Sequence, residues 1–216
     1  MFDKKQNWGN GMPENVISTL EQLSSIYEEA HPLSIQKETK FLTDEYIKWL
    51  EKSRFFAFAT SGKDGLDCSP RGDAKDQTFK LLDNKTLIFP DRRGNNRLDS
   101  LKNIIANPQI AMMFLIPGVN EALRINGKAQ LTTDPDLLSL FDMDGKLPKV
   151  VIHVSVEAVY FQCARALIRS GLWQSDAVVD PKTVPTAGKM LKSAKEDFDA
   201  DSYDTQLPDR QSSTLY

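Results

Sequence analysis

The sequence predicts a mainly β protein with flanking helices, in which antiparallel strands form a small closed or split barrel. Six or so short apolar runs have the length and alternation of strands, and most of them are joined by hairpin turns. Few helical patterns lie between these runs or at the ends of the chain. The chain contains neither a GxGxxG nor a GxxxxGKS/T motif, which disfavours a doubly wound α/β fold.

The length and composition are those of one globular domain with appendages. The chain has 216 residues, of which 40% are hydrophobic, and a net charge of -3. This acidic balance disfavours nucleic acid as a partner and makes any basic cluster a local feature suited to a small anion. Cys68 and Cys163 lie far apart without metal-ligand spacing, so we expect no disulfide framework, no metal site and a reducing compartment.

Neither a signal-peptide pattern nor a membrane-spanning segment is found in the sequence. The longest apolar run, 110–116, is far too short to cross a bilayer. We therefore expect a soluble, cytoplasmic protein that does not bind membranes.

Three parts are expected along the chain: an N-terminal helical segment at 1–40, the barrel domain at 41–174 and a C-terminal arm at 175–216. One helix should begin at Pro13 and end at His31–Pro32, and a second should span about 43–50, with Trp49 in the core. The arm is polar apart from a helical piece at 186–194, so it must pack against a partner or remain mobile.

The first hairpin pairs 55–60 with 66–73 and carries a polar motif on its second strand. Asp67, Ser69 and Arg71 alternate with Cys68, Pro70 and Gly72, so the polar side chains share one face. Proline and glycine favour an edge position or a bulge, where the backbone can approach a ligand closely. The alternative is that this stretch is simply a turn.

A second hairpin, 78–82 with 86–89, leads directly into a basic loop and a helix. The helix should begin near residue 97, with Asn95 or Asn96 as its cap, and end at Asn107–Pro108. Three arginines and a glycine precede a helix N-terminus, whose free N–H groups and dipole attract anions. This pattern predicts a cradle for a phosphate monoester; the alternative is a solvated, charged loop.

The later strands are predicted at 109–116, 122–131 and 150–161, with a short helix at 135–141 and another at 162–171. The strand at 122–131 alternates without a break, and its polar face, which includes Arg124 and Asn126, belongs either to solvent or to a site. A split barrel leaves an apolar sheet face and an open cleft that the polar arm cannot cover. We therefore expect a homodimer in which a second copy covers them.

Four motifs in this order resemble the pyridoxamine 5′-phosphate oxidase-like, FMN-binding split-barrel family, over about residues 31–195. The motifs are Ser69–Asp73, Pro90–Leu101, Leu123–Gly127 and Cys163–Trp173. The resemblance implies an antiparallel split β-barrel of the FMN-binding type and a homodimer with FMN in a cleft between the subunits. It also implies that residues 175–216 pack on the dimer.

The resemblance also implies roles for individual residues. The flavin or its phosphate would be lined by Ser69, Arg71 and Gly72, and the phosphate would be held by Arg92, Asn95, Asn96 and Arg97. Arg124 would contribute from its strand. The partner subunit would supply Arg165 and Trp173. Two positions depart from the pattern, because Gln162 replaces a common histidine and Arg93 a common proline. The C-terminal substrate signature of the vitamin B6 oxidases is not found, so pyridoxamine phosphate is not implied as substrate.

These features favour a flavin-dependent oxidoreductase in which the cofactor carries the chemistry. Arg71 or Arg124 would supply positive charge near the reduced flavin, and no protein acid or base is required. This agrees with a chain that has only two histidines and no triad candidate. The alternatives are a non-catalytic flavin binder for storage or sensing and a haem-binding split barrel.

Overall fold

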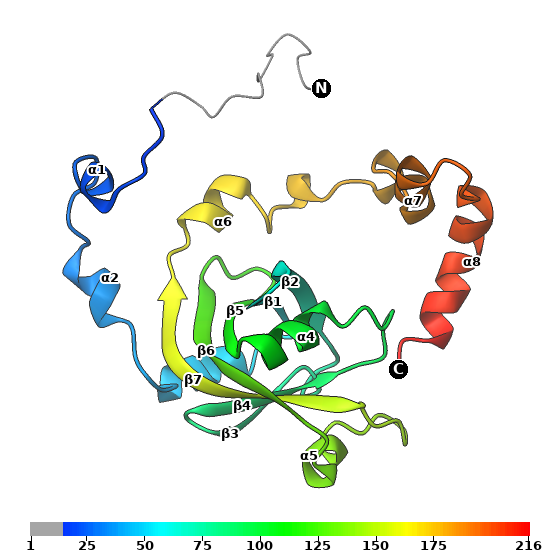
Figure 1. Cartoon of the computed structure of the whole chain (residues 1–216), viewed down its shortest axis with the longest axis horizontal. Helices are drawn as coiled ribbons and strands as arrows, with labels where there is room; N and C mark the ends of the chain where they lie inside the picture. The colour runs from blue at the N-terminus through cyan, green and yellow to red at the C-terminus, as the bar shows by residue number, and fades with distance from the viewer. Residues whose placement is uncertain (1–14) are drawn as a thin grey trace. The chain divides into compact units, whose positions relative to one another are not determined.

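The computed structural model describes residues 15–216 (Figure 1). Residues 37–216 form one compact unit, and the described residues that precede it belong to a second unit. None of the helices in this described part of the chain combines the length and the apolar character needed to cross a membrane.

The N-terminal segment contains two short helices in place of the single helix predicted from Pro13, a start that lies outside the described residues. The first, α1 (Leu20–Ser24), begins at Thr19, whose hydroxyl accepts a hydrogen bond from the backbone N–H of Gln22 at 3.2 Å. Pro32 does not end a helix but opens the second, α2 (Pro32–Gln36). The prediction was wrong here because proline at the first helical position loses no hydrogen bond and already has helical φ.

Seven antiparallel strands form the sheet, which confirms the predicted fold class. They are β1 (Phe55–Gly62), β2 (Gly65–Gly72), β3 (Lys80–Asp83), β4 (Thr86–Asp91), β5 (Gln109–Leu115), β6 (Ala122–Thr132) and β7 (Val150–Gln162). Their order across the sheet is β2-β1-β5-β6-β7-β4-β3. The edge strands β2 and β3 are not paired with each other in this order, so the barrel is split, and β2 has the edge position that its proline predicts.

The strands begin and end close to the predicted residues, except at β3. This strand starts at Lys80 rather than at Thr78. Thr78 is buried, and its hydroxyl donates to the carbonyl oxygens of Arg54 and Asp73, both at 3.3 Å. These bonds hold Thr78 in the connection after β2 instead of in a strand.

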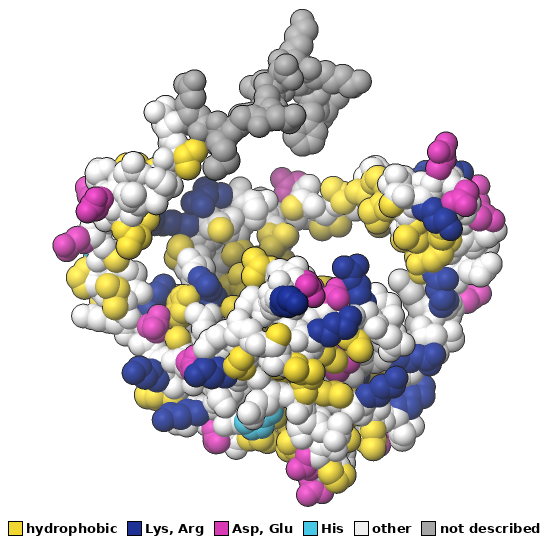
Figure 2. Space-filling view, viewed as in Figure 1, with side chains coloured by type: hydrophobic (Ala, Val, Ile, Leu, Met, Phe, Trp, Pro, Cys, Tyr) yellow, Lys and Arg dark blue, Asp and Glu magenta, His cyan; other side chains and the backbone are white. Residues whose placement is uncertain are grey.

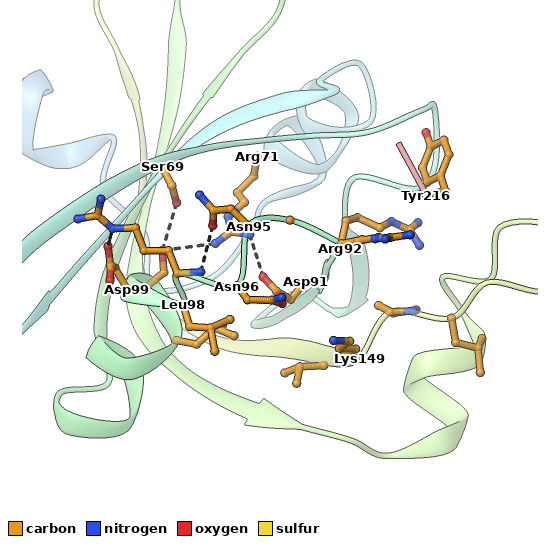
Figure 3. Close-up of a pocket in the computed structure, with 18 of the residues that line it drawn as sticks. Ser69, Arg71, Asp91, Arg92, Asn95, Asn96, Leu98, Asp99, Lys149 and Tyr216 are labelled. Carbon is orange, nitrogen blue, oxygen red and sulfur yellow. Dashed lines mark hydrogen bonds and ion pairs between the residues drawn. The ribbon is translucent and has the colours of Figure 1, made fainter. Parts of the chain in front are cut away.

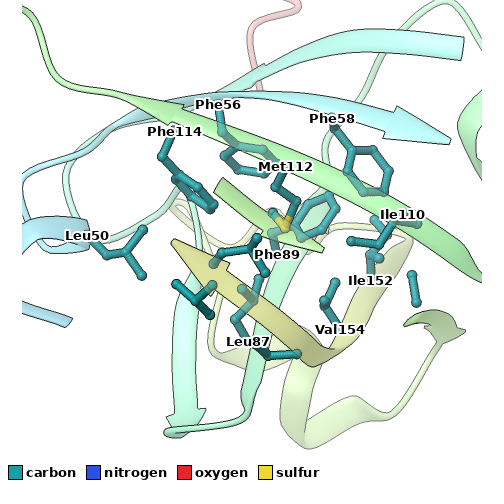
Figure 4. Packing of buried hydrophobic residues seen from close by; sticks show 14 of the residues in the cluster. Leu50, Phe56, Phe58, Leu87, Phe89, Ile110, Met112, Phe114, Ile152 and Val154 are labelled. Carbon is teal, nitrogen blue, oxygen red and sulfur yellow. The ribbon is translucent and has the colours of Figure 1, made fainter. Parts of the chain in front are cut away.

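The core is an aromatic cluster enclosed by the barrel (Figure 4). The ring of Phe89 meets those of Phe56 and Phe58 edge to face, with centroid distances of 5.1 and 5.0 Å. Leu50, at the end of α3 (Asp44–Leu50), is fully buried in the same cluster, and Trp49 packs against it as predicted. Burial of these inward-facing side chains fixes which face of each strand points outward.

Five further α-helices follow in the chain. They are α4 (Asp99–Ala106), α5 (Pro135–Ser139), α6 (Arg165–Ser170), α7 (Ala187–Ala194) and α8 (Ala200–Ser213). Of these, α4 and α5 pack against strands of the sheet. The last helix, α8, was not predicted, because its sequence is polar and contains Pro208. It packs on α7, where the Asp204 carboxylate accepts a hydrogen bond from the N–H of Gly188 at 2.7 Å.

Gly127 lies at a β-bulge between β6 and β7. A Cβ atom at this position would lie 2.2 Å from the carbonyl oxygen of Ser155, which is backbone and cannot rotate away. We expect Gly127→Ala to lower the free energy of unfolding by about 1–3 kcal/mol through overpacking. Urea unfolding monitored by circular dichroism measures this change.

The matched control is Gly94→Ala, because the nearest atom to a Cβ there is 4.0 Å away. It should change stability by less than about 1 kcal/mol. Equal stabilities of the two variants would contradict the steric role of Gly127.

Candidate functional site

One cavity of about 1110 Å³ lies where the predicted cradle meets the split edge of the barrel (Figure 3). Four segments line it: alternate residues of β2, the loop and first turn from Asp91 to Leu101, the segment Lys146–Val150 that leads into β7, and Ser213 and Tyr216 at and beyond the end of α8. The structure brings six of the predicted site residues together here: Ser69, Arg71, Arg92, Asn95, Asn96 and Arg97.

A hydrogen-bonded cluster joins β2 to the first turn of α4. The hydroxyl oxygens of Ser69 and Ser100 are 3.2 Å apart, and Ser100 also donates to the Asp67 carboxylate. Arg71 donates to Ser100 at 3.3 Å and pairs with Asp91 at 3.0 Å. The prediction that Asp67, Ser69 and Arg71 share a face is thus confirmed, whereas Ser100 was missed because nothing in the sequence connects it to β2.

Arg71 retains unused donor capacity. Its Nε is buried and has no hydrogen-bond partner among the described residues. A buried donor without a partner costs free energy, so such a group is usually satisfied by a ligand or by water. Arg71 also lines the cavity, so a small shift of its side chain would let it contact an acceptor there.

Arg92 has a different environment, because protein groups already bind its guanidinium. It pairs with Asp73 at 2.7 Å and donates to the Phe141 carbonyl oxygen at 2.7 Å and to the Gln77 side chain at 3.0 Å. The side chain of Asp73 is only 4% exposed, and that of Arg92 is 17% exposed. Arg92 thus forms part of the cavity wall and ties three connections of the barrel together.

The basic loop enters α4 with residues in the left-handed backbone conformation, and no asparagine side chain caps the helix. Asn96 and Leu98 have φ values of 57° and 62°, and Leu98 occupies the N-cap position without a side-chain bond. The capping prediction was wrong because Asn95 accepts a hydrogen bond from the N–H of Arg97 at 3.0 Å, which forms a local turn. Arg97 itself is 78% exposed and pairs with Asp99.

The cavity carries an excess of positive charge. Six cationic side chains and three carboxylates line it: Arg71, Arg92, Arg93, Arg97, Lys146 and Lys149, against Asp67, Asp91 and Asp99. Within the described part of the chain, Arg93, Lys146 and Lys149 form no ion pair. The two lysines were missed because they lie in an irregular loop with no periodic pattern. In a chain of net charge -3, this local excess favours an anionic ligand.

Tyr216 lies at the Arg92 end of the cavity and was also missed. Its hydroxyl donates to Asp73 at 2.7 Å, and its ring centroid is 5.6 Å from the Arg92 guanidinium carbon. The hydrogen bond to Asp73, together with partial burial, raises the pKa of Tyr216 above its ordinary value. The hydroxyl therefore keeps its proton and the contact at neutral pH.

Four predicted site residues do not line this cavity. Gly72 follows Arg71 at the end of β2, Arg124 lies on β6 with its guanidinium carbon 5.1 Å from the Tyr160 ring centroid, and Arg165 begins α6. Trp173 follows α6, and its indole N–H donates to the Val119 carbonyl oxygen of the same chain at 2.8 Å.

The outer sheet face, formed by Ala57, Ala111, Met113, Asn126 and Ala158, lies opposite the aromatic core. These residues are neighbours across β1, β5, β6 and β7 in the sheet register. They are small, apart from Met113 and Asn126, and Met113 is 41% exposed. The side-chain oxygen of Asn126 is buried and has no partner among the described residues, so this face offers an unused acceptor.

No group of three or more His, Cys, Asp or Glu side chains that could hold a metal ion is found in residues 15–216. His153 lies on β7 between Ile88 and Gln130 of the neighbouring strands, and it does not line the cavity. The cavity therefore offers arginine, lysine, serine, asparagine and carboxylate groups, together with Tyr216.

Comparison with known proteins gives one family match and a set of similar structures. Residues 42–163 match the family described as pyridoxamine 5′-phosphate oxidase. A variant of HupZ from Group A Streptococcus is 21% identical, with 56% of this chain and 99% of that chain covered at a TM-score of 0.47. A candidate pyridoxamine 5′-phosphate oxidase from Lactobacillus delbrueckii is 20% identical, with coverages of 56% and 95% and a TM-score of 0.45. No curated protein sequence matches the chain.

The two arginines of the loop should differ in their effect on stability. Arg92→Met leaves the buried Asp73 carboxylate without its cation, which should cost about 3–5 kcal/mol of unfolding free energy. Arg97→Met removes an exposed ion pair, which should cost less than about 1 kcal/mol. Chemical unfolding of both variants, compared with the unmodified protein, tests this difference. A small effect at Arg92 would show that its network does not stabilise the fold.

Proposed function

The chain belongs to the pyridoxamine 5′-phosphate oxidase family, and we propose that it binds FMN and acts as a flavin-dependent oxidoreductase on a small molecule. One observation carries this proposal: the cavity combines excess positive charge with a buried, unpartnered donor on Arg71. Such a site fits an anion that accepts several hydrogen bonds, as a phosphate monoester does.

We assign the phosphate to the part of the cavity between β2 and the start of α4. Ser69, Arg71 and Arg97 would bind it, together with the amides of Asn95 and Asn96. The cluster supplies charge for one terminal phosphate, and the sequence has no Rossmann fingerprint for a dinucleotide, so FMN is favoured over FAD. Arg92 has a supporting role in this assignment, because its donors already bind Asp73, Gln77 and Phe141.

Bound FMN would supply hydride transfer at its N5 atom, so the protein needs to provide binding, orientation and electrostatic stabilisation. Arg71, fixed by Asp91 and Ser100, holds a positive charge on the cavity wall. We infer that this charge, with those of Lys146 and Lys149, stabilises the anionic ligand and any negative charge that develops on it. The titratable side chains that line the cavity in the described part of the chain are aspartates, lysines, arginines and Tyr216, and hydride transfer to or from the flavin does not itself require any of them.

We keep a second candidate, a non-catalytic flavin binder for storage or sensing, because the positively charged cavity would bind the phosphate in either case. The two candidates share the phosphate site and differ in whether bound flavin exchanges electrons with a substrate. Bleaching of the yellow protein by a nicotinamide donor, followed by reoxidation with an added acceptor, would support the oxidoreductase. A flavin that stays oxidised with every donor would support the binder.

We further propose a homodimer that completes the flavin site. The outer sheet face is rich in small residues and contains the unpartnered oxygen of Asn126, so a second copy can approach it closely. Arg124 lies on this face too, where it is paired with Met113 of β5 and Tyr160 of β7, and Arg165 and Trp173 follow β7. In this arrangement these residues serve the partner's flavin. In this arrangement the arm from 175 packs on the dimer, which buries exposed apolar side chains of the arm such as Val178 and Met190. Figure 2 shows hydrophobic side chains at the surface of the arm.

The cofactor proposal predicts that the purified protein is yellow and releases FMN, as identified by chromatography. Arg97→Ala should weaken FMN binding roughly 10- to 150-fold, because a charge-assisted arginine–phosphate contact contributes about 1.5–3 kcal/mol. Riboflavin, which lacks the phosphate, is the matched control ligand, and its affinity should hardly change. Release of haem, or equal losses for FMN and riboflavin, would overturn the assignment.

The dimer proposal predicts that Met113→Arg, on the outer sheet face, converts the dimer to a monomer and weakens FMN binding. A buried, unpaired arginine would oppose association. Leu82→Arg is the matched control, because Leu82 is 45% exposed and lies on β3, away from this face. Light scattering and FMN titration measure both effects. A monomeric unmodified protein, or equal behaviour of the two variants, would contradict the proposal.

A further inference from the structure

Two hydrogen bonds attach the C-terminal arm to the barrel, one just before the arm begins and one at Tyr216. Trp173 donates its indole N–H to the Val119 carbonyl oxygen, and Tyr216 donates its hydroxyl to Asp73. Among the described residues, no other hydrogen bond or ion pair joins 173–216 to the barrel. Figure 1 shows the arm leaving the barrel through α6 and its end returning beside it after α8.

The attachment at Tyr216 is formed on the cavity wall itself. Asp73 accepts the tyrosine hydroxyl with one carboxylate oxygen and the Arg92 guanidinium with the other, at 2.7 Å in both cases. The Tyr216 ring stands beside Arg92, as Figure 3 shows, and Ser213 lines the same cavity. The barrel thus provides a buried carboxylate as a fixed acceptor, and the arm provides a removable donor.

We propose that Tyr216 is a ligand-retaining wall of the cavity, docked on Asp73 and released when its hydrogen bond breaks. The ring closes the Arg92 end of the cavity while it is docked. Because only one hydrogen bond and the contact of the ring with Arg92 hold Tyr216 among the described residues, this part of the arm can open locally at a small fraction of the cost of global unfolding. A ligand then enters and leaves during these openings. The inference rests on the proposed function only in using FMN as the probe.

The kinetics of FMN binding distinguish a wall from an ordinary binding contact. Removal of a wall speeds both entry and exit, whereas removal of a contact speeds exit alone. We expect Tyr216→Ala and Tyr216→Phe to raise the association and dissociation rates together, by about tenfold, since each loses a hydrogen bond to a charged group. The dissociation constant should change less than either rate. Stopped-flow measurement of flavin fluorescence gives both rates.

Tyr203→Phe is the matched control. Tyr203 lies on α8 and contacts Phe198 and Arg210 within the arm, and its hydroxyl forms no hydrogen bond among the described residues. This variant should bind and release FMN at the rates of the unmodified protein. Rate changes equal to those of Tyr216→Phe would overturn the inference, as would a rise in dissociation rate alone for the Tyr216 variants.

A second measurement needs no flavin. Trypsin should cleave after Arg210 about tenfold faster in the flavin-free Tyr216→Phe protein than in the flavin-free unmodified protein or the Tyr203→Phe control, because the end of the arm is no longer held. Equal cleavage rates would overturn the inference whatever the flavin result. Failure of every protein to bind FMN, with cleavage still faster in Tyr216→Phe, would overturn the proposed function and leave the docking of Tyr216 supported.

Discussion

The buried ion pair between Asp73 and Arg92 is the interaction on which the site depends. Asp73 directly follows β2, and Arg92 directly follows β4, two strands that lie far apart in the sheet order. The pair therefore joins parts of the barrel that no strand ladder connects. Through Gln77 and Phe141, Arg92 also holds the connections before β3 and after α5. The cavity is open at the split of the barrel, yet the part of its wall that Arg92 forms is fixed.

The arginines of the cavity differ in how many protein partners they have and in how exposed they are. Protein acceptors bind Nε and both terminal nitrogens of Arg92, which has a structural role, whereas the side chain of Arg97 is largely exposed and pairs with Asp99 alone among the described residues. Arg71 is intermediate, because two of its nitrogens are held and a third is buried without a partner. Electrostatic attraction for a ligand thus comes from side chains whose positions are constrained to different degrees. The more exposed groups can adjust to the ligand while Arg71 keeps its orientation.

The sequence was sufficient to predict the fold class and much of the cavity wall, because both follow from local periodicity. Alternation placed Asp67, Ser69 and Arg71 on one face, and the loop from Asp91 was expected at the site. Ser100, Lys146 and Tyr216 were not predicted, since only long-range packing brings them to the cavity. Helix α8 was missed for the same reason, because its pairing with α7, and not its polar sequence, accounts for it.

The two free edges of the sheet have a consequence for how the protein avoids aggregation. An unpaired strand edge is a template on which other chains can add a strand. On β2, Pro70 lies in the middle of the edge and has no N–H to offer to an added strand. On the opposite side, β3 has only four residues and so presents little edge. The protein can thus keep an open barrel at high concentration without growing into a continuous intermolecular sheet.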